Sequence, residues 1–253
     1  MTLIDTHAHL YYDQMYNNLD TVLDEATENG VTKIICIGTD LNTSKQSVEI
    51  ANKYENVYAA VGIHPHDSKD VTKDYLKDLE ALALSSKKVV AVGEIGIDHY
   101  RNISPKEIQE KVMIEQMELA QSLSLPIIFH NRDADNDIIE ILKQHSFSRA
   151  IAHCYSSDLS FAEQLIDLNV LLSFSGNVTF KNSINQSAIQ NITLKDFVLE
   201  TDCPFLAPQP FRGKPNEPKY VKDIALFISD LLDIAFEEIA IQTTNNAESF
   251  FKI

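Results

Sequence analysis

Two histidines near the N-terminus, His7 and His9, are separated by one residue and follow a short apolar run. If this run is a β-strand, side chains alternate between its faces, so both imidazoles point the same way. Two imidazoles on one face can bind a single metal ion, because imidazole is a common ligand of divalent metals. The motif alone is a weak signal, since an isolated histidine is often only a hydrogen-bonded polar residue. Its meaning depends on whether further ligands follow later strands.

Further ligand-type residues do follow later apolar runs. In chain order they are His64, Glu94, His130, His153 and Asp202. Catalytic residues of α/β barrels lie at the carboxyl ends of the strands, and the first and last strands of a closed barrel are neighbours. We therefore expect six side chains to meet on one rim as a metal centre: His7, His9, Glu94, His130, His153 and Asp202.

The elements that must position these residues alternate regularly along the chain. The eight predicted strands are 3–6, 33–38, 57–63, 88–93, 126–130, 149–153, 170–174 and 197–202. They are nearly continuous apolar runs, as in a parallel sheet that is covered on both faces. Amphipathic stretches separate them, and two helices near 219–232 and 236–251 close the chain. The pattern predicts a (β/α)8 TIM barrel with an additional C-terminal helix, forming a single domain over residues 1–253. A doubly wound open sheet is the alternative.

Composition limits the partners and the setting. The 21 basic and 37 acidic residues give a net charge of −16, which disfavours binding to nucleic acid through the overall field. Bound metal ions and a local basic patch can reverse that potential at a site. Three scattered cysteines and the absence of a signal-peptide pattern favour the cytoplasm. No run approaches the roughly 18 apolar residues of a membrane span. We expect no membrane association, and no obligate protein partner is evident.

The expected set contains more ligands than one ion can bind. Four imidazoles and two carboxylates are too many for a single tetrahedral zinc, which takes about four ligands. They suit two divalent ions, with Glu94 bridging. The division that we expect gives one ion to His7, His9 and Asp202, and the other to His130 and His153. Two ions about 3.5–4 Å apart can activate a water and stabilise the attacking and leaving oxygens of a displacement. Asp202 can also accept a proton from that water, so Asp202 and Glu94 are the candidate catalytic residues.

The chain resembles the TatD-type metal-dependent hydrolases, within the amidohydrolase-like metal barrels. The matching segments occur in family order and are 4–10, 62–66, 93–98, 125–132, 152–156, 199–208, 212–213 with 216 and 218, and 246–247. The resemblance implies a (β/α)8 barrel with a divalent metal centre at the six residues named above. It also implies hydrolysis of DNA phosphodiester bonds, as a 3′-to-5′ exonuclease. Some relatives are linked instead to deacylation of D-aminoacyl-tRNA, so tRNA is a second candidate substrate.

Two motifs depart from the family pattern. The sixth-strand motif of the family commonly ends in glycine, and this chain has Ser157 at that position. The fourth-strand motif commonly ends in Leu-Asp-Tyr, whereas this chain has His99 between Asp98 and Tyr100. Neither departure touches a predicted ligand, but both could change the fit of the substrate. His99 is expected to be a surface or loop residue, and Asp98 could orient a ligand or bind substrate.

Two residues are candidates for substrate binding. His64 either contacts a scissile phosphate or is a rim histidine fixed by Pro65, and the sequence leaves both open. Arg132 follows the fifth strand and, with Arg212 and Lys214, would form a local basic rim that meets phosphate on the family interpretation.

Three functions remain in competition. The leading hypothesis is a deoxyribonuclease that uses two divalent ions, and the alternative is an acyl or ester hydrolase such as a D-aminoacyl-tRNA deacylase. A catalytically silent scaffold is the third, and the intact ligand set counts against it. The ions are Mg²⁺, Mn²⁺ or Zn²⁺: four imidazoles favour Zn²⁺ or Mn²⁺, whereas activity in the family is usually associated with Mg²⁺.

Overall fold

The strands of the computed structural model, which describes residues 2–145, 147 and 149–253, follow one another in sequence order. They are β1 Leu3–Ala8, β2 Val31–Ile37, β3 Val57–Val61, β4 Val89–Asp98, β5 Ile127–Arg132, β6 Ala150–Ala152, β7 Val170–Phe174 and β8 Phe197–Leu199. The sheet order runs from β1 to β8 without a reversal. A doubly wound sheet would reverse its order at a switch point, so this topology is that of the predicted (β/α)8 barrel.

Helices separate the strands. The α-helices are α1 Asp13–Tyr16, α2 Leu19–Glu28, α3 Leu41–Lys53, α4 Tyr75–Ser85, α5 Lys106–Ser122, α6 Asp135–His145, α7 Leu159–Asp167, α8 Asn185–Ile189, α9 Val221–Leu232 and α10 Phe236–Phe251. Short 3₁₀ helices are η1 Pro65–Asp70, η2 Gly176–Thr179, η3 Gln209–Phe211 and η4 Pro218–Tyr220. The two helices α9 and α10 after β8 confirm the predicted additional C-terminal helix. The short helices α1 and η1 were not expected from the sequence. Among the described helices, none has the length and apolarity needed to cross a membrane.

The chain groups into two compact units. Unit 1 comprises the residues up to Ile35, Cys154–Ile166 and Leu171–Ile253, and unit 2 comprises Cys36–His153 and Asp167–Val170. The expectation of a single domain over residues 1–253 stays a prediction.

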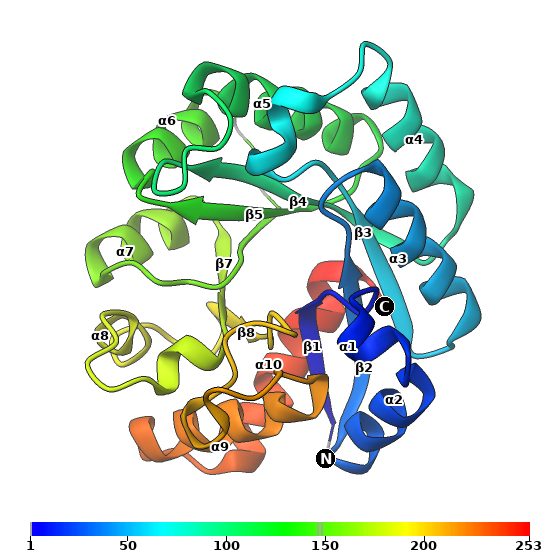
Figure 1. The fold of residues 1–253 in the computed structure, drawn as a ribbon. Helices are drawn as coiled ribbons and strands as arrows, with labels where there is room; N and C mark the ends of the chain where they lie inside the picture. The colour runs from blue at the N-terminus through cyan, green and yellow to red at the C-terminus, as the bar shows by residue number, and fades with distance from the viewer. Residues whose placement is uncertain (1, 146, 148) are drawn as a thin grey trace. The chain divides into compact units, whose positions relative to one another are not determined.

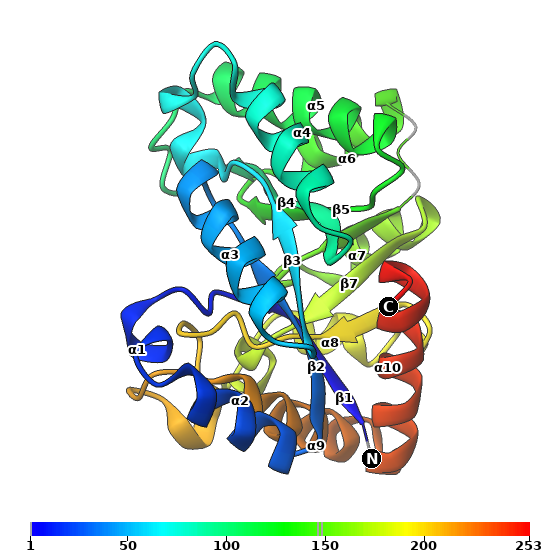
Figure 2. The ribbon, with the colours of Figure 1, turned by 90° about the vertical axis from the view of Figure 1, so that its right-hand side faces the viewer.

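In unit 2, the helices α3, α4 and α5 pack beside strands β3 and β4 (Figures 1 and 2). All ten residues of β4 are buried, which explains its almost continuous apolar sequence. Helix α3 begins where Asp40 accepts a hydrogen bond from the Thr43 backbone N–H at 2.6 Å, and the Thr43 hydroxyl accepts one from Asp40 N–H at 2.9 Å. This reciprocal capping satisfies donors at the first turn, so the helix starts directly after the β2 loop.

In unit 1, the helices α9 and α10 pack against β1, and both also contact β8. Buried Asp5 in β1 accepts hydrogen bonds from the backbone N–H and the hydroxyl of Thr201, at 2.9 and 2.6 Å. Burial raises the pKa of Asp5 to about 8, although the bonds from Thr201 oppose that shift. Asp5 therefore has a structural role: it ties β1 to the segment that follows β8.

β4 and β8 differ most from their predicted C-terminal ends. β4 continues past Glu94 to Asp98, because its pairing with β5 resumes after a register shift and extends to the Asp98–Arg132 pair. β8 ends at Leu199, so Asp202 follows the strand instead of closing it. Asp202 has a left-handed φ of 59°, which an extended strand does not accommodate. Its backbone N–H donates to His7 O at 2.9 Å, so this turn pairs with the end of β1.

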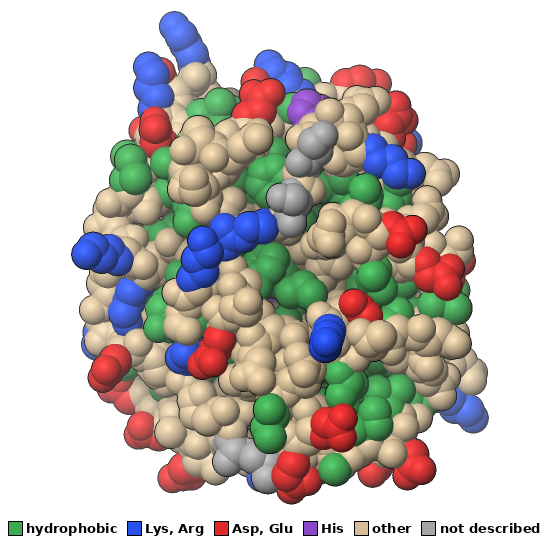
Figure 3. Space-filling view, turned by 180° about the vertical axis from the view of Figure 1, so that it is seen from behind, with side chains coloured by type: hydrophobic (Ala, Val, Ile, Leu, Met, Phe, Trp, Pro, Cys, Tyr) green, Lys and Arg blue, Asp and Glu red, His purple; other side chains and the backbone are tan. Residues whose placement is uncertain are grey.

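Charged side chains are mixed on the surface. On the face seen in Figure 3, both acidic and basic side chains are spread among polar and apolar ones. With a net charge of −16, any attraction for a polyanion must come from particular basic side chains and bound cations near the site.

Candidate metal centre

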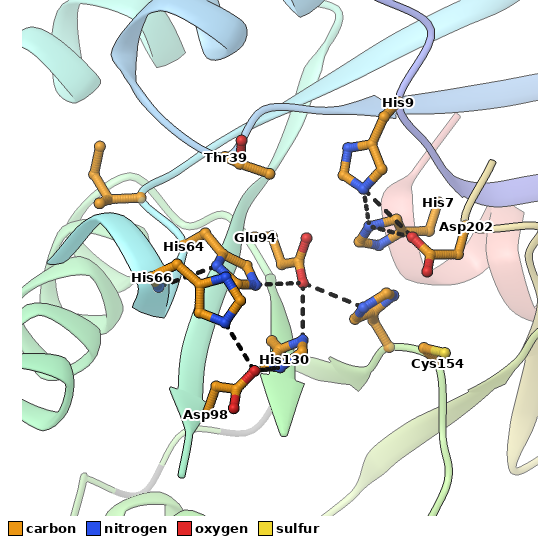
Figure 4. Close-up of polar contacts among 12 residues, drawn as sticks. His7, His9, Thr39, His64, His66, Glu94, Asp98, His130, Cys154 and Asp202 are labelled. Atoms are coloured by element: carbon orange, nitrogen blue, oxygen red, sulfur yellow. Dashed lines mark hydrogen bonds and ion pairs between the residues drawn. The ribbon is translucent and has the colours of Figure 1, made fainter. Parts of the chain in front are cut away.

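The first group of ligand-type side chains, here called the N-terminal cluster, consists of His7, His9 and Asp202 in unit 1 (Figure 4). The Nε2 atoms of His7 and His9 lie 3.3 Å apart. Asp202 Oδ1 lies 3.4 Å from His9 Nε2 and 3.9 Å from His7 Nε2. All three residues are buried. The predicted pairing of the opening histidines with the aspartate after β8 is therefore present in the geometry.

Backbone bonds and one tyrosine fix this cluster. The Asp202 N–H bond to His7 O is followed by a bond from His9 N–H to Cys203 O at 2.9 Å, so the two segments align residue by residue. The Tyr11 hydroxyl lies 3.1 Å from His9 Nδ1. A partner on the second ring nitrogen fixes the orientation of a metal-ligating imidazole, so Tyr11 directs His9 Nε2 toward the cluster.

The second group, here called the Glu94 cluster, consists of Glu94, His64, His130 and His153 in unit 2. Three imidazole nitrogens surround one oxygen of Glu94. Glu94 Oε1 lies 3.2 Å from His130 Nδ1, 3.2 Å from His153 Nε2 and 3.4 Å from His64 Nε2. Figure 4 shows the side chains of Glu94, His64 and His130 pointing toward one another. Among the described residues, His64, Glu94 and His130 form one of the groups close enough to hold an ion.

The spacing in both clusters fits a divalent ion. Ligand atoms bound to one tetrahedral ion at 2.0–2.1 Å lie about 3.4 Å from one another. In the N-terminal cluster the three ligand atoms lie 3.3–3.9 Å from one another, and in the Glu94 cluster three nitrogens lie 3.2–3.4 Å from Glu94 Oε1. The donors are imidazole nitrogens and carboxylate oxygens, which suit Zn²⁺ and Mn²⁺ and include the oxygens that Mg²⁺ prefers. The N-terminal cluster and the group of His64, Glu94 and His130 therefore have donor atoms and spacings that fit a divalent ion.

The charge states of Glu94 and His64 favour metal binding. Burial alone would raise the pKa of Glu94, but the neighbouring imidazoles of His153 and His64 hold it well below its ordinary value. Burial lowers the pKa of His64 to about 4, against the attraction of Glu94. Glu94 is thus a carboxylate and His64 a neutral imidazole, which are the protonation states that bind a cation. Against the effect of burial, hydrogen bonds to Asp98 and Glu94 raise the pKa of His130, so a cation that binds this imidazole must displace its proton.

Asp98 contacts the Glu94 cluster through His130. Its carboxylate Oδ2 lies 2.9 Å from His66 Nε2 and 3.2 Å from His130 Nε2, and its Oδ1 accepts from Arg101 N–H at 2.6 Å. Burial opposes the charge on Asp98, yet these hydrogen bonds, led by that of His130, lower its pKa below the ordinary value. When His130 Nε2–H donates to Asp98, Nδ1 is the ring nitrogen that faces Glu94 and that can bind a cation once it has lost its proton. The role of Asp98 that the sequence left open is therefore to orient His130.

We expect Asp98→Asn to weaken divalent-metal binding by about 10- to 100-fold, because the amide is a weaker acceptor and His130 loses its fixed orientation. Titration calorimetry of the metal-free protein with Mn²⁺ measures this. Asp137→Asn is the matched control, since Asp137 contacts His99 instead of the cluster. Equal affinity in wild type and Asp98→Asn would contradict the orienting role.

The two predicted substrate residues have different surroundings. His64 faces Glu94 directly, and its Nδ1 accepts from His66 N–H at 3.1 Å, so it lies within the Glu94 cluster. Arg132 is exposed at the end of β5, with its guanidinium 3.9 Å from the centroid of the Tyr100 ring. Among the described residues, no carboxylate forms an ion pair with Arg132.

Some neighbouring residues were missed or misjudged from the sequence. His99 lies in the turn after β4, as expected of a loop residue, but its side chain is only 8% exposed and contacts Asp137. Tyr11 lies just outside the matching segment 4–10, and His66 lies within the segment 62–66, but neither was expected to be the partner of a ligand. Glu200 lies two residues before Asp202, is fully buried, and accepts from the Cys154 backbone N–H at 2.9 Å. The sequence signal that could have identified Glu200 as a site residue is its position in the matching segment that contains Asp202.

Known proteins match this chain along nearly its whole length. The family model described as TatD related DNase matches residues 4–252. YabD of Bacillus subtilis, named an uncharacterized metal-dependent hydrolase, is 42% identical over 99% of both chains. YcfH of Escherichia coli K12, named in the same way, is 34% identical over 100% of this chain and 97% of its own.

Solved structures agree with the fold. The crystal structure of YjjV, a TatD homolog from Escherichia coli K12, superposes with a TM-score of 0.95 at 30% identity, covering 99% of this chain and 98% of that one. A TatD family hydrolase from Entamoeba histolytica gives 0.91 at 25% identity, with coverage of 99% and 98%. Two clusters of candidate ligand side chains on a (β/α)8 fold accord with these matches, and the chain belongs to the TatD family of metal-dependent hydrolases.

Proposed function

We propose that this hydrolase cleaves phosphodiester bonds of DNA from the 3′ end, using one divalent ion in each of the two clusters. The observation that carries the proposal is the spacing of imidazole and carboxylate atoms, between 3.2 and 3.9 Å in both clusters. The description of the matching family as TatD related DNase supports the choice of DNA. That Glu94 bridges the two ions stays a prediction.

When bound, the two ions would supply positive charge for the phosphoryl oxygens and lower the pKa of a water molecule. The remaining roles belong to side chains. Asp202 directs Oδ1 at the histidines of its cluster, which leaves Oδ2 to accept a proton from the attacking water. Glu94 holds its negative charge among three imidazoles, so it anchors the second ion.

Arg132 is suited to hold the substrate phosphate. Its guanidinium lies over the Tyr100 ring, and this stacking leaves the N–H edge free to bind a phosphate in a bidentate way. Arg212 has the same arrangement over Phe180, at 4.1 Å from the ring centroid. Such local cations offset the overall charge of −16 where the DNA backbone binds.

The test compares two substrates side by side. We expect the protein with Mg²⁺ or Mn²⁺ to shorten a 5′-labelled single-stranded oligonucleotide from its 3′ end, a chelator to stop the reaction, and added metal to restore it. Glu94→Gln, purified in the same way, controls for a contaminating nuclease. No shortening with either ion, together with rapid release of D-amino acid from charged tRNA, would replace the DNA assignment with the deacylase.

A further inference from the structure

Two aromatic side chains next to the N-terminal cluster are exposed. Tyr12 precedes α1 and is 38% exposed, and Phe205 follows β8 and is 46% exposed. Their ring centroids lie 5.5 Å apart and their planes are nearly perpendicular, at 83°. We call Tyr12 and Phe205 the aromatic pair. Leu206 beside it is also exposed, so this apolar surface is shared by neighbouring side chains.

The aromatic pair lies against a candidate metal ligand. The ring centroids of Tyr12 and Phe205 are each 6.1 Å from that of His9. Each ring therefore makes an edge contact with His9, so a flat ligand stacked on the aromatic pair would lie beside the N-terminal cluster. A phosphate joined to that ligand through a sugar can then reach the N-terminal cluster.

The rings are held in place before any substrate binds. Tyr11 stacks on Tyr12 with centroids 5.1 Å apart, and its hydroxyl contacts His9 Nδ1 at 3.1 Å. Phe205 N–H donates to Asp202 O at 2.9 Å, and buried Asn216 donates from Nδ2 to Phe205 O at 2.6 Å. The Tyr12 ring and the Phe205 backbone are thus linked to residues of the N-terminal cluster, which limits the entropy lost when a ligand stacks on this pair.

We propose that the aromatic pair stacks a nucleobase of the substrate nucleotide whose phosphate or ester is cleaved. The inference rests on the proposed function, since it assumes a substrate that contains a nucleotide. Stacking suits this role because every base has a π face, so a nuclease that acts without regard to sequence can use it at each step. A small lactone or amide offers no such face.

Equilibrium binding tests the inference without any hydrolysis. Thymidine 5′-monophosphate and 2-deoxyribose 5-phosphate share the sugar and the phosphate, and only the first has a base. With Mn²⁺-loaded protein, calorimetry should give a Kd that is about 5- to 150-fold lower for the nucleotide. Phe205→Leu and Tyr12→Leu should reduce this ratio, and Phe205→Trp should preserve it. Tyr16→Leu is the matched control, because Tyr16 is an exposed tyrosine of α1 without a ring contact among the described residues.

The outcomes separate this inference from the proposed function. Equal affinity of the wild type for both ligands, or an unchanged ratio in both Leu variants, would overturn the stacking role even if the protein shortens DNA. A nucleotide preference that the Leu variants lose would support it even if DNA is not shortened. In oligonucleotide assays, the Leu variants should raise KM and leave kcat nearly unchanged, because stacking binds ground state and transition state alike.

Discussion

Glu94→Gln is expected to lower kcat by about 10²- to 10⁴-fold while the protein remains folded. One oxygen of Glu94 lies within 3.2–3.4 Å of three imidazole nitrogens, and its negative charge is the feature that the amide removes. Gln has nearly the same shape, so packing should be retained. Turnover of the oligonucleotide measures the loss, circular dichroism checks the fold, and elemental analysis reports the bound metal.

The control for Glu94→Gln is Glu107→Gln in α5, an exposed residue at which the same change of charge should leave kcat unaltered. If kcat of Glu94→Gln were close to that of the wild type, the proposed metal mechanism would be wrong, because the Glu94 carboxylate would not be required for catalysis.

Asp202→Asn should produce a loss of similar size, about 10²- to 10⁴-fold in kcat. Asp202 Oδ1 lies beside His7 and His9, and in the proposed function Oδ2 accepts the proton of the attacking water. The substitution should therefore weaken metal binding at the N-terminal cluster and also slow the chemical step at saturating metal. Calorimetry with Mn²⁺ follows the first effect, and single-turnover kinetics follow the second.

Exposed Asp13 in α1 offers the matched control for this variant, and Asp13→Asn should behave as wild type. If saturating metal restored full turnover to Asp202→Asn, Asp202 would act only as a metal ligand. Another group would then have to accept the proton of the attacking water.

The sequence was sufficient for the fold class and for the residue types of the candidate site. Nearly continuous apolar runs separated by amphipathic stretches indicate strands buried on both faces, and this pattern needs no knowledge of contacts. Parallel strands place their carboxyl ends on one side, so His7, His9 and Asp202 could be grouped before any distance was known. Their assignment as ligands stays a prediction that the variants above test.

Strand ends were less predictable, because pairing partners decide where a strand stops. Glu94 lies inside β4, since β5 continues the ladder to Asp98. Asp202 lies in a turn that pairs with β1. Both partners are distant in sequence, and local propensity carries no information about them.

The sequence by itself determined the family, the alternating fold and the set of ligand-type residues, because these follow from local periodicity and from motifs. Only the tertiary structure revealed that Asp98 orients His130, that Asp5 ties β1 to Thr201, and that Tyr12 meets Phe205. Each of these contacts joins residues that folding brings together across 32 to 196 positions of sequence. Their energies arise from burial and hydrogen-bond geometry, which exist only once the chain has folded.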